Sequence, residues 1–255
     1  MMILAIDSSA KPASVAVCSN GELLGQYFQN NGLTHSRTLL SMTDSLLKNL
    51  NVRASEIDIV AVSRGPGSFT GVRIGVSAAK GFAWGADKQV CGVSTLEAMA
   101  YQIPEPGLLI CPVMDARRGQ VYNALFEWKD GTVQRLCDDR AISLDDLATE
   151  LLNMASKNKN TASPETSAII PNSEFRIPNS HVFLVGDGAA ISYEHLSSAG
   201  IQCSIAPVLL RNQTAYGVAL AAIKTEPINA IELEPSYLRP SQAEREMKRS
   251  STASG

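Results

Sequence analysis

The residues best placed to take part in chemistry lie at 65–75, where the sequence is GPGSFTGVRIG. This segment follows an apolar run at 57–62, which predicts a buried strand, and leads into a helix predicted over 71–86. Glycines at such a junction indicate either anion binding at the helix start or close packing of two backbones. A Walker A loop is excluded because no lysine follows, and the Rossmann fingerprint is excluded because Thr70 stands at the third glycine position.

Small residues recur along the predicted helix 71–86. A glycine inside a helix costs about 1 kcal/mol relative to alanine, so a closely packed neighbouring helix is expected to offset that cost. A second helix, predicted over 35–50, carries more leucines than a narrow apolar stripe needs, and about half of them are accounted for by its own sheet. The two helices are therefore predicted to form a partner interface containing Leu39, Leu46, Gly71, Gly75, Ala78, Ala79 and Phe82.

Two aspartates, Asp7 and Asp115, each end an apolar strand and precede a turn. Such a carboxylate can bind a hydrated cation, but it more often accepts hydrogen bonds from the turn amides that follow it. Gly186 and Gly188 flank Asp187 after a third apolar strand, where a plain turn is the simpler interpretation. A residual nucleotide cleft, if one is retained, is predicted to contain Asp7, Ser8, Asp115, Gly186 and Gly188.

The elements that position these residues occur in the same order twice, as three strands, a helix, a strand and a helix. The first set is predicted at 2–7, 13–18, 22–28, 35–50 (with Thr34 as N-cap), 57–62 and 71–86. The second is predicted at 108–114, 120–127, 132–137, 144–154 (with Ser143 as N-cap), 181–185 and 189–198. This duplication is typical of the actin, Hsp70 and sugar-kinase superfamily, so the predicted fold is a duplicated actin-like/Hsp70-like (ASKHA) α/β fold with a mixed sheet in each lobe.

The predicted lobes cover 1–104 and 105–241, and a helix at 212–224 is expected to pack back on the first lobe. The segment 155–180 is rich in Ser, Asn, Thr, Pro and Lys, which predicts a flexible insertion, and 242–255 is predicted to be a disordered tail.

Composition limits the classes of protein that fit. The chain of 255 residues is 45% apolar and carries a net charge of −3, which argues against a domain that binds nucleic acid by itself. Its five cysteines are scattered without a Cys-x-x-Cys pair, so buried reduced thiols are expected rather than disulfides or a metal site. The apolar run at 2–6 is too short for a signal peptide or a membrane span, so a cytoplasmic protein without membrane contact is expected.

Four segments together resemble the bacterial TsaB (YeaZ) family. They are 2–9 (MILAIDSS), 65–75 (GPGSFTGVRIG), 114–122 (MDARRGQVY) and 236–240 (SYLRP). The resemblance covers nearly the whole chain apart from 155–180 and the last dozen residues. It implies a non-catalytic scaffold that activates a catalytic paralogue, TsaD, in forming N6-threonylcarbamoyladenosine at position 37 of tRNAs that read ANN codons.

The resemblance also implies partners: TsaD, the small ATPase TsaE, a second copy of the chain when it is alone, and tRNA only through the complex. The metal-binding His-x-x-x-His pair of the paralogue corresponds to 94–101 here, where no histidine occurs and Glu97 alone would be a weak ligand. Neither a metal, a catalytic residue nor a tightly bound cofactor is therefore expected, although ATP or ADP is compatible with the assembled complex.

Two rival classes remain open on the sequence. One is a stand-alone enzyme, either an ATP-dependent member of the same superfamily or a metallopeptidase-like protein, against which the altered phosphate turns and the missing histidine pair argue. The other is a homodimeric binding protein, which would use the same helices, so the sequence does not separate a homodimer from a heterodimer.

Overall fold

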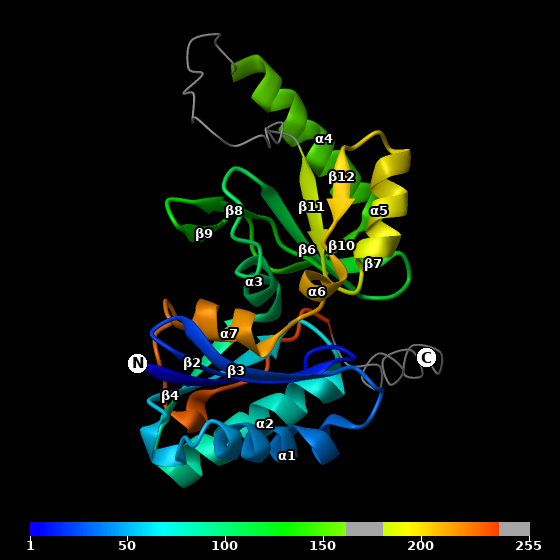
Figure 1. The fold of residues 1–255 in the computed structure, drawn as a ribbon. Helices are drawn as coiled ribbons and strands as arrows, with labels where there is room; N and C mark the ends of the chain where they lie inside the picture. Colours follow the sequence, from blue (N-terminus) through cyan, green and yellow to red (C-terminus); the bar gives the residue numbers. More distant parts are fainter. Residues whose placement is uncertain (162–180, 240–255) are drawn as a thin grey trace, which may run out of the picture. The chain divides into compact units, whose positions relative to one another are not determined.

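The computed structural model describes residues 1–161 and 181–239, and the side chains of residues 1–156 and 181–239. The chain divides into two compact units (Figure 1). Unit 1 contains Met1–Ala98 and the chain from Gln213 onward, and unit 2 contains Met99–Asn212. Each unit has its own apolar core, and the two are described separately below.

Unit 1 is built on a five-stranded sheet with the order β3-β2-β1-β4-β5. Helices α1 and α2 cover one face of this sheet and α7 covers the other (Figure 1). The central strand β1 pairs antiparallel with β2 and parallel with β4. The elements are β1 (Met2–Asp7), β2 (Ala13–Ser19), β3 (Glu22–Gln29), α1 (His35–Asn49), η1 (Ala54–Glu56), β4 (Ile59–Gly65), α2 (Phe69–Ala86), β5 (Gln89–Ser94), α7 (Ala215–Ala222) and η2 (Ala230–Glu232). Along the chain, the division between the units falls within the short α3 (Thr95–Ala100).

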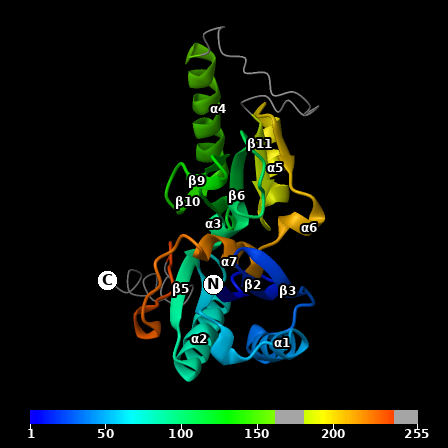
Figure 2. The same cartoon turned by 60° about the vertical axis from the view of Figure 1, so that its left-hand side comes forward.

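Unit 2 repeats this topology, with the strand order β10-β7-β6-β11-β12. Its first strand, β6, again pairs antiparallel with the next strand, β7, and parallel with a later one, β11. Helix α5 packs on β6, β11 and β12 (Figure 2). The elements are β6 (Leu109–Asp115), β7 (Gln120–Asn123), β8 (Phe126–Lys129), β9 (Thr132–Arg135), β10 (Arg140–Ser143), α4 (Leu144–Thr161), β11 (Val182–Val185), α5 (Ala189–Ser198), β12 (Cys203–Ile205) and α6 (Val208–Arg211).

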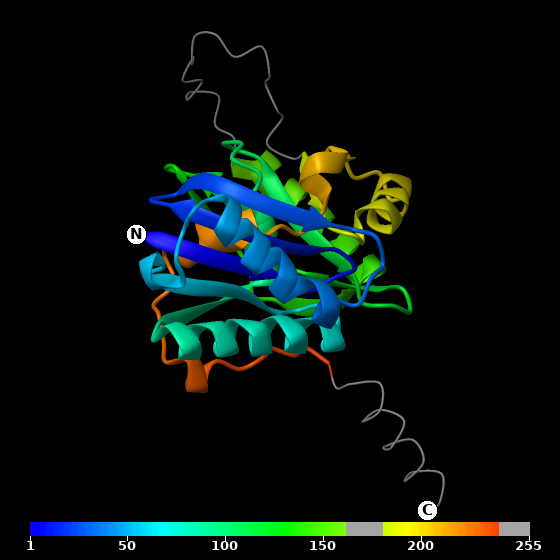
Figure 3. The ribbon, with the colours of Figure 1, turned by 60° about the horizontal axis from the view of Figure 1, so that its bottom comes forward.

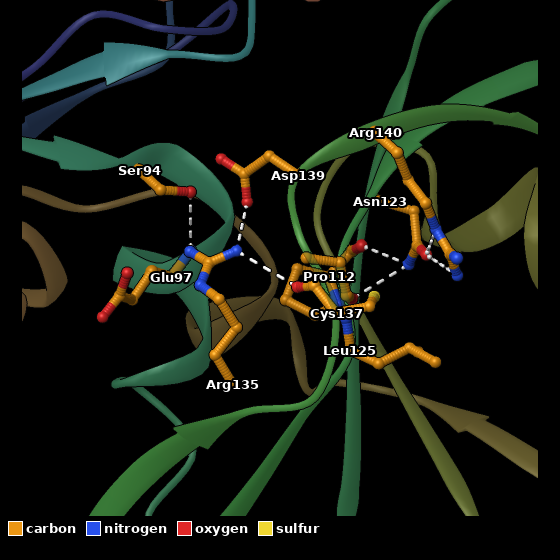
Figure 4. Close-up of polar contacts among 10 residues, drawn as sticks. Ser94, Glu97, Pro112, Asn123, Leu125, Arg135, Cys137, Asp139 and Arg140 are labelled. Carbon is orange, nitrogen blue, oxygen red and sulfur yellow. Dashed lines mark hydrogen bonds and ion pairs between the residues drawn. The ribbon is translucent and has the colours of Figure 1, made fainter.

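The predicted strand 120–127 is two strands that pair with different parts of β6, and Asn123 is the residue at which they separate. Its Nδ2 donates to the carbonyls of Pro112 and Ala124, each at 3.0 Å, and its Oδ1 accepts from Arg140 Nη2 at 3.2 Å (Figure 4). A buried amide that is satisfied in this way fixes the break in the strand. The sequence pattern shows apolar residues on both sides and gives no sign of the break.

Two predicted helix starts have different outcomes. The Ser143 cap is confirmed, because its Oγ accepts from Asp146 N at 3.0 Å. Thr34 precedes α1 as predicted but makes no side-chain hydrogen bond to it. Helix α4 extends to Thr161, so the first part of the predicted insertion 155–180 is helical. The remainder of that insertion and the predicted tail 242–255 lie outside the described residues.

The two units divide the chain differently from the predicted lobes 1–104 and 105–241. The sequence after 212 returns to unit 1 because α7 is hydrogen-bonded to its sheet. Ala215 N donates to Ser14 Oγ at 3.1 Å, and Tyr216 N donates to Gln26 Oε1 at 3.0 Å. These bonds supply partners for amides in the first turn of α7, where a helix offers none of its own.

All five cysteines are free thiols, three buried and two half-buried. Burial raises the pKa of Cys111 to about 12 and that of Cys18 to about 11, which keeps both protonated at neutral pH. Among the residues that the structure describes, no helix combines the length and the apolar character that crossing a membrane would require.

We expect Ser14→Ala to destabilise unit 1. Ser14 is buried, donates to Tyr27 O at 3.1 Å and accepts from Ala215 N, so its removal leaves a buried amide without its partner. Such a loss costs about 1–3 kcal/mol in the free energy of unfolding. Urea unfolding measures it, with exposed Ser41→Ala as the matched control. Equal unfolding curves for the two variants would contradict a role for Ser14 in holding α7.

Candidate functional site

The glycine-rich segment 65–75 packs against the turn that follows β1. Ser68 N donates to Ser9 O at 2.6 Å, and Ser8 Oγ donates to Gly71 O at 2.9 Å. A Cβ atom placed on Gly71 or Gly75 would collide with Ser8. Of the two uses that the glycines allow, the structure therefore contains close backbone packing.

This packing corrects the predicted partner interface. Leu39, Leu46 and Ala79 belong to the core of unit 1, and Gly71 and Gly75 are buried against Ser8. The prediction assumed that a stripe of small residues faces another molecule, but here it faces the chain's own β1 turn. Of the seven predicted residues, only Ala78 and Phe82 are partly exposed, and both also pack on the core.

The outward side of the same two helices nevertheless forms a groove. It has a volume of about 500 Å³ and lies between α1 and α2, which are neighbours on the same face of the sheet in Figure 3. Leu39, Leu40, Ile74 and Ala78 contribute its apolar part. Its polar part is formed by His35, Ser36, Thr70, Arg73 and Ser77, and Phe69 completes the lining.

Exposed apolar side chains extend this surface on both helices. Leu40 of α1 is 58% exposed and Trp84 of α2 is 85% exposed, so both add apolar area to it. Ser77, Gly81 and Gly85 are also exposed, and a Cβ added to either glycine would meet no atom within 4 Å. Helix α2 thus has two small-residue stripes, one packed inward on Ser8 and one facing outward. We call the outward surface, made of the groove, Leu40, Trp84 and these three small residues, the α1–α2 face.

Asp7 caps the turn after β1. Its Oδ1 accepts from Ser9 N at 3.0 Å and from Ser9 Oγ at 2.9 Å, which confirms the interpretation of Asp7 as a turn cap. Burial raises the pKa of the Asp7 carboxyl, and the hydrogen bonds from Ser9 oppose that shift. In unit 1, therefore, the two predicted cleft residues Asp7 and Ser8 are both engaged by their own chain.

In unit 2, the other three predicted cleft residues lie together where β6 and β11 end. Asp115 Oδ1 accepts from Arg117 N at 2.7 Å, the same capping role that Asp7 has. Asp187 Oδ1 accepts from Asp115 N at 3.2 Å, and burial raises the pKa of the Asp187 carboxyl. Gly186 has φ +114°, and a Cβ there would collide with Val113 O, while Gly188 N donates to that carbonyl at 3.1 Å. These glycines too serve close packing.

Within residues 1–161 and 181–239 there is no group of three or more His, Cys, Asp or Glu side chains that could hold a metal ion. The Asp115–Asp187 pair therefore offers two carboxylates, fewer ligands than a protein-held divalent cation normally has. Whether nucleotide binds near them stays a prediction.

The sequence of this chain is similar to those of known proteins. A family model described as TsaD, tRNA N6-adenosine threonylcarbamoyltransferase, matches residues 30–246. The TsaB protein of Bacillus subtilis is 36% identical over 144 residues, which are 56% of this chain and 63% of that protein. The TsaB protein of Escherichia coli is 37% identical over 129 residues, which are 50% of this chain and 55% of that protein. The chain belongs to the TsaB (YeaZ) family.

The stretches that match this TsaB-family chain span less than two thirds of the length of each of these two curated relatives. A solved structure of YeaZ from Pseudomonas aeruginosa superposes with a TM-score of 0.68 over 93% of this chain and 99% of that one, at 24% identity. That likeness, together with the repeated strand order, confirms the predicted duplicated actin-like α/β fold.

Prediction from the sequence named two residues that line the groove of this TsaB-family chain, Leu39 and Ala78, but missed the exposed residues of the α1–α2 face. Trp84, Gly81 and Ser77 lie on α2 at helical spacing, as do the buried glycines, but on its other side. The signal that could have found them is an exposed tryptophan beside small residues in an otherwise apolar helix. The sequence instead draws attention to the inward stripe, because its glycines belong to the more distinctive motif.

Replacing a glycine of α2 by alanine should have opposite effects on the free energy of unfolding in the inward and the outward stripe. Gly75→Ala is expected to lower the free energy of unfolding by about 1–3 kcal/mol because its new methyl group overlaps Ser8. Gly81→Ala is the matched control, and it should raise the free energy by about 0.5–1 kcal/mol through helix propensity alone. Chemical unfolding of both variants measures the difference. A stabilised Gly75→Ala protein would mean that the inward packing is loose.

The raised pKa of Asp7 gives a pH dependence. A carboxyl whose pKa is higher in the folded protein than the ordinary 3.8 binds its proton more tightly when folded, so its contribution to stability falls as pH rises above 3.8. Asp7→Asn keeps an acceptor for Ser9 but does not ionise. The difference in unfolding free energy, variant minus wild type, should grow as pH rises from about 4 to the raised pKa and then stay constant. Urea unfolding over a pH series measures it, and a difference independent of pH would count against a buried, titrating Asp7.

Proposed function

We propose that this protein is a non-catalytic subunit of the complex that forms N6-threonylcarbamoyladenosine at position 37 of tRNAs that read ANN codons. It binds a catalytic TsaD-type paralogue through the α1–α2 face and thereby activates it. The observation that carries the proposal is the groove between α1 and α2, with Leu40 at its edge and Trp84 on the same helix surface. Its family supports the pathway, since the curated relatives are named for the biosynthesis of this modification.

The chemistry of the face suits a helical partner. A groove between two parallel ridges accepts a ridge of side chains from another helix, and the exposed small residues on α2 allow the backbones to approach closely. An exposed Trp side chain is of the kind that dominates binding energy when it becomes buried at an interface centre, and an exposed Leu adds apolar area to the contact. Docking of two such helices on an equivalent pair gives a four-helix bundle.

The turns support a role without catalysis of its own. At the start of α2, an amide that could bind a phosphate donates to Ser9 O, and Ser8 fills the space beside Gly71 and Gly75. In unit 2, Asp115 binds the amide of Arg117. Both turns are thus occupied by the chain's own groups, which argues against efficient phosphate transfer.

The remaining parts of the proposal concern the assembly. A TsaE-type ATPase joins the complex, ATP or ADP binds only within it, and tRNA is contacted through the other subunits. In the absence of its paralogue the chain pairs with a second copy through the same face. The complex works in the cytoplasm. Co-purification of the chain with each partner, followed by a modification assay with each subunit omitted, tests these statements together.

Leu40→Glu is expected to abolish docking because it places a charge in the apolar part of the groove. The affinity for the TsaD-type paralogue should fall by about 2 kcal/mol or more, and formation of the modified nucleoside should fall with it. Leu152→Glu is the matched control, because Leu152 is a half-exposed leucine of α4 in unit 2. Calorimetric titration and nucleoside analysis measure both effects. If Leu152→Glu weakens docking as strongly as Leu40→Glu, the interface lies elsewhere.

A further inference from the structure

The sequence near the end of the chain, 228–239, runs back along unit 1 and is fixed at several points. Ile228 and Val90 exchange two backbone hydrogen bonds, at 2.9 and 3.0 Å. Lys80 of α2 donates from Nζ to the carbonyls of Ile231 and Leu233, each at 3.0 Å. Ser236 N then donates to Arg64 O at 2.6 Å, next to Gly65, where a Cβ would collide with the Ser236 carbonyl. The SYLRP segment therefore reaches the start of the GPGSFTGVRIG segment.

Tyr237 makes the next contact, and this contact is with the α1–α2 face. Its ring stacks on the ring of Phe69, with centroids 4.6 Å apart and an interplanar angle of 27°. The guanidinium carbon of Arg73 lies over the Phe69 ring, 4.7 Å from the centroid. Phe69 and Arg73 both line the groove. Tyr237 and Arg73 thus both contact the Phe69 ring at the groove, and we call these three residues the Tyr237 stack.

Anchoring the chain end does not by itself require Tyr237. The Ile228, Lys80 and Ser236 contacts already hold 228–236, whereas the Tyr237 side chain remains 40% exposed. The ring is stacked on Phe69, a residue that lines the groove. Stacking on Phe69 restricts that ring, and the ring in turn offers its face to the Arg73 cation.

Arg73 has charge available for a partner. Its side chain is exposed, and no carboxylate among the described residues pairs with it. The groove that it lines also contains His35 and Ser36, and none of its lining residues is acidic. A guanidinium held in one orientation binds a carboxylate through two parallel hydrogen bonds, which a freely rotating side chain does less well.

We infer that Tyr237 is a positioning residue for docking. Through Phe69 it holds Arg73 at the groove, where the guanidinium binds an aspartate or glutamate on the partner helix whose apolar side chains fill the groove. This inference rests on the proposed function and adds the chemistry of the partner: an amphipathic helix with a carboxylate beside its apolar ridge. It also gives the SYLRP segment a role, since the two most distinctive segments of the chain then build one surface.

The test combines binding with a signal from Arg73 itself. Tyr237→Ala, Tyr237→Phe and the control Ile231→Ala, an exposed residue of the same segment, are titrated with the TsaD-type paralogue. Tyr237→Ala is expected to weaken binding by about five- to tenfold, the size of one aromatic or cation–π contact, whereas Tyr237→Phe keeps the stacked ring and should bind like wild type. In an Arg73→Gln background, Tyr237→Ala should cause no further loss. Thermal unfolding confirms that each variant is folded, and the NMR signal of the Arg73 Nε–H group is recorded in the free proteins.

The outcomes separate this inference from the proposed function. If wild type binds and Tyr237→Ala binds equally well, the positioning role is overturned while the docking proposal stands. A loss that persists in the Arg73→Gln background also overturns it, because Tyr237 would then act by another route. If the wild-type protein fails to bind the paralogue, the proposed function is wrong. The NMR signal of the Arg73 Nε–H group then tests the Tyr237 stack by itself. A change in its chemical shift in Tyr237→Ala but not in Tyr237→Phe supports the stack, and an unchanged chemical shift rejects it.

Discussion

The contact on which unit 1 depends is the close approach of α2 to the turn after β1. Ser8 and Ser9 touch α2 through a backbone hydrogen bond at 2.6 Å and a side-chain hydrogen bond at 2.9 Å, and two glycines make room for them. Because Gly71 and Gly75 face this turn, the opposite side of α2 faces solvent. The inward glycines are therefore a condition for the outward α1–α2 face rather than a part of it.

Unit 2 uses the same constraint at the equivalent position, which explains why the duplicated topology keeps its turn chemistry. Gly186 and Gly188 follow β11 and pack on β6, just as Gly67 follows β4 and packs on Ser9 in the turn after β1. Asp7 and Asp115 each cap their own turn. An anion-binding version of this turn would need those amides free, so capping and phosphate binding compete for the same donors.

Much of this could be predicted from the sequence because it depends on local signals. The strands that end at Asp7 and Asp115 and the Ser143 cap follow from apolar periodicity and turn residues. What could not be predicted depends on contacts distant in sequence. The break at Asn123 depends on the Pro112 carbonyl and on Arg140, and the direction in which Gly75 faces depends on Ser8, sixty-seven positions away. Periodicity shows that a helix has a stripe of small residues, but not whether that stripe faces its own chain.

The C-terminal segment illustrates the same distinction at greater range. Residues 236–239 have no partner that local pattern could name, yet Ser236 binds Arg64 O and Tyr237 stacks on Phe69. Both contacts fall on the strand-to-helix junction that the glycines already hold close to Ser8 and Ser9. Two separate segments therefore fix the start of α2 from opposite ends of the chain. A helix start held in this way presents the first residues of its outward side, Phe69 and Arg73, with little freedom, and reduced freedom lowers the entropy that a partner must remove when it binds.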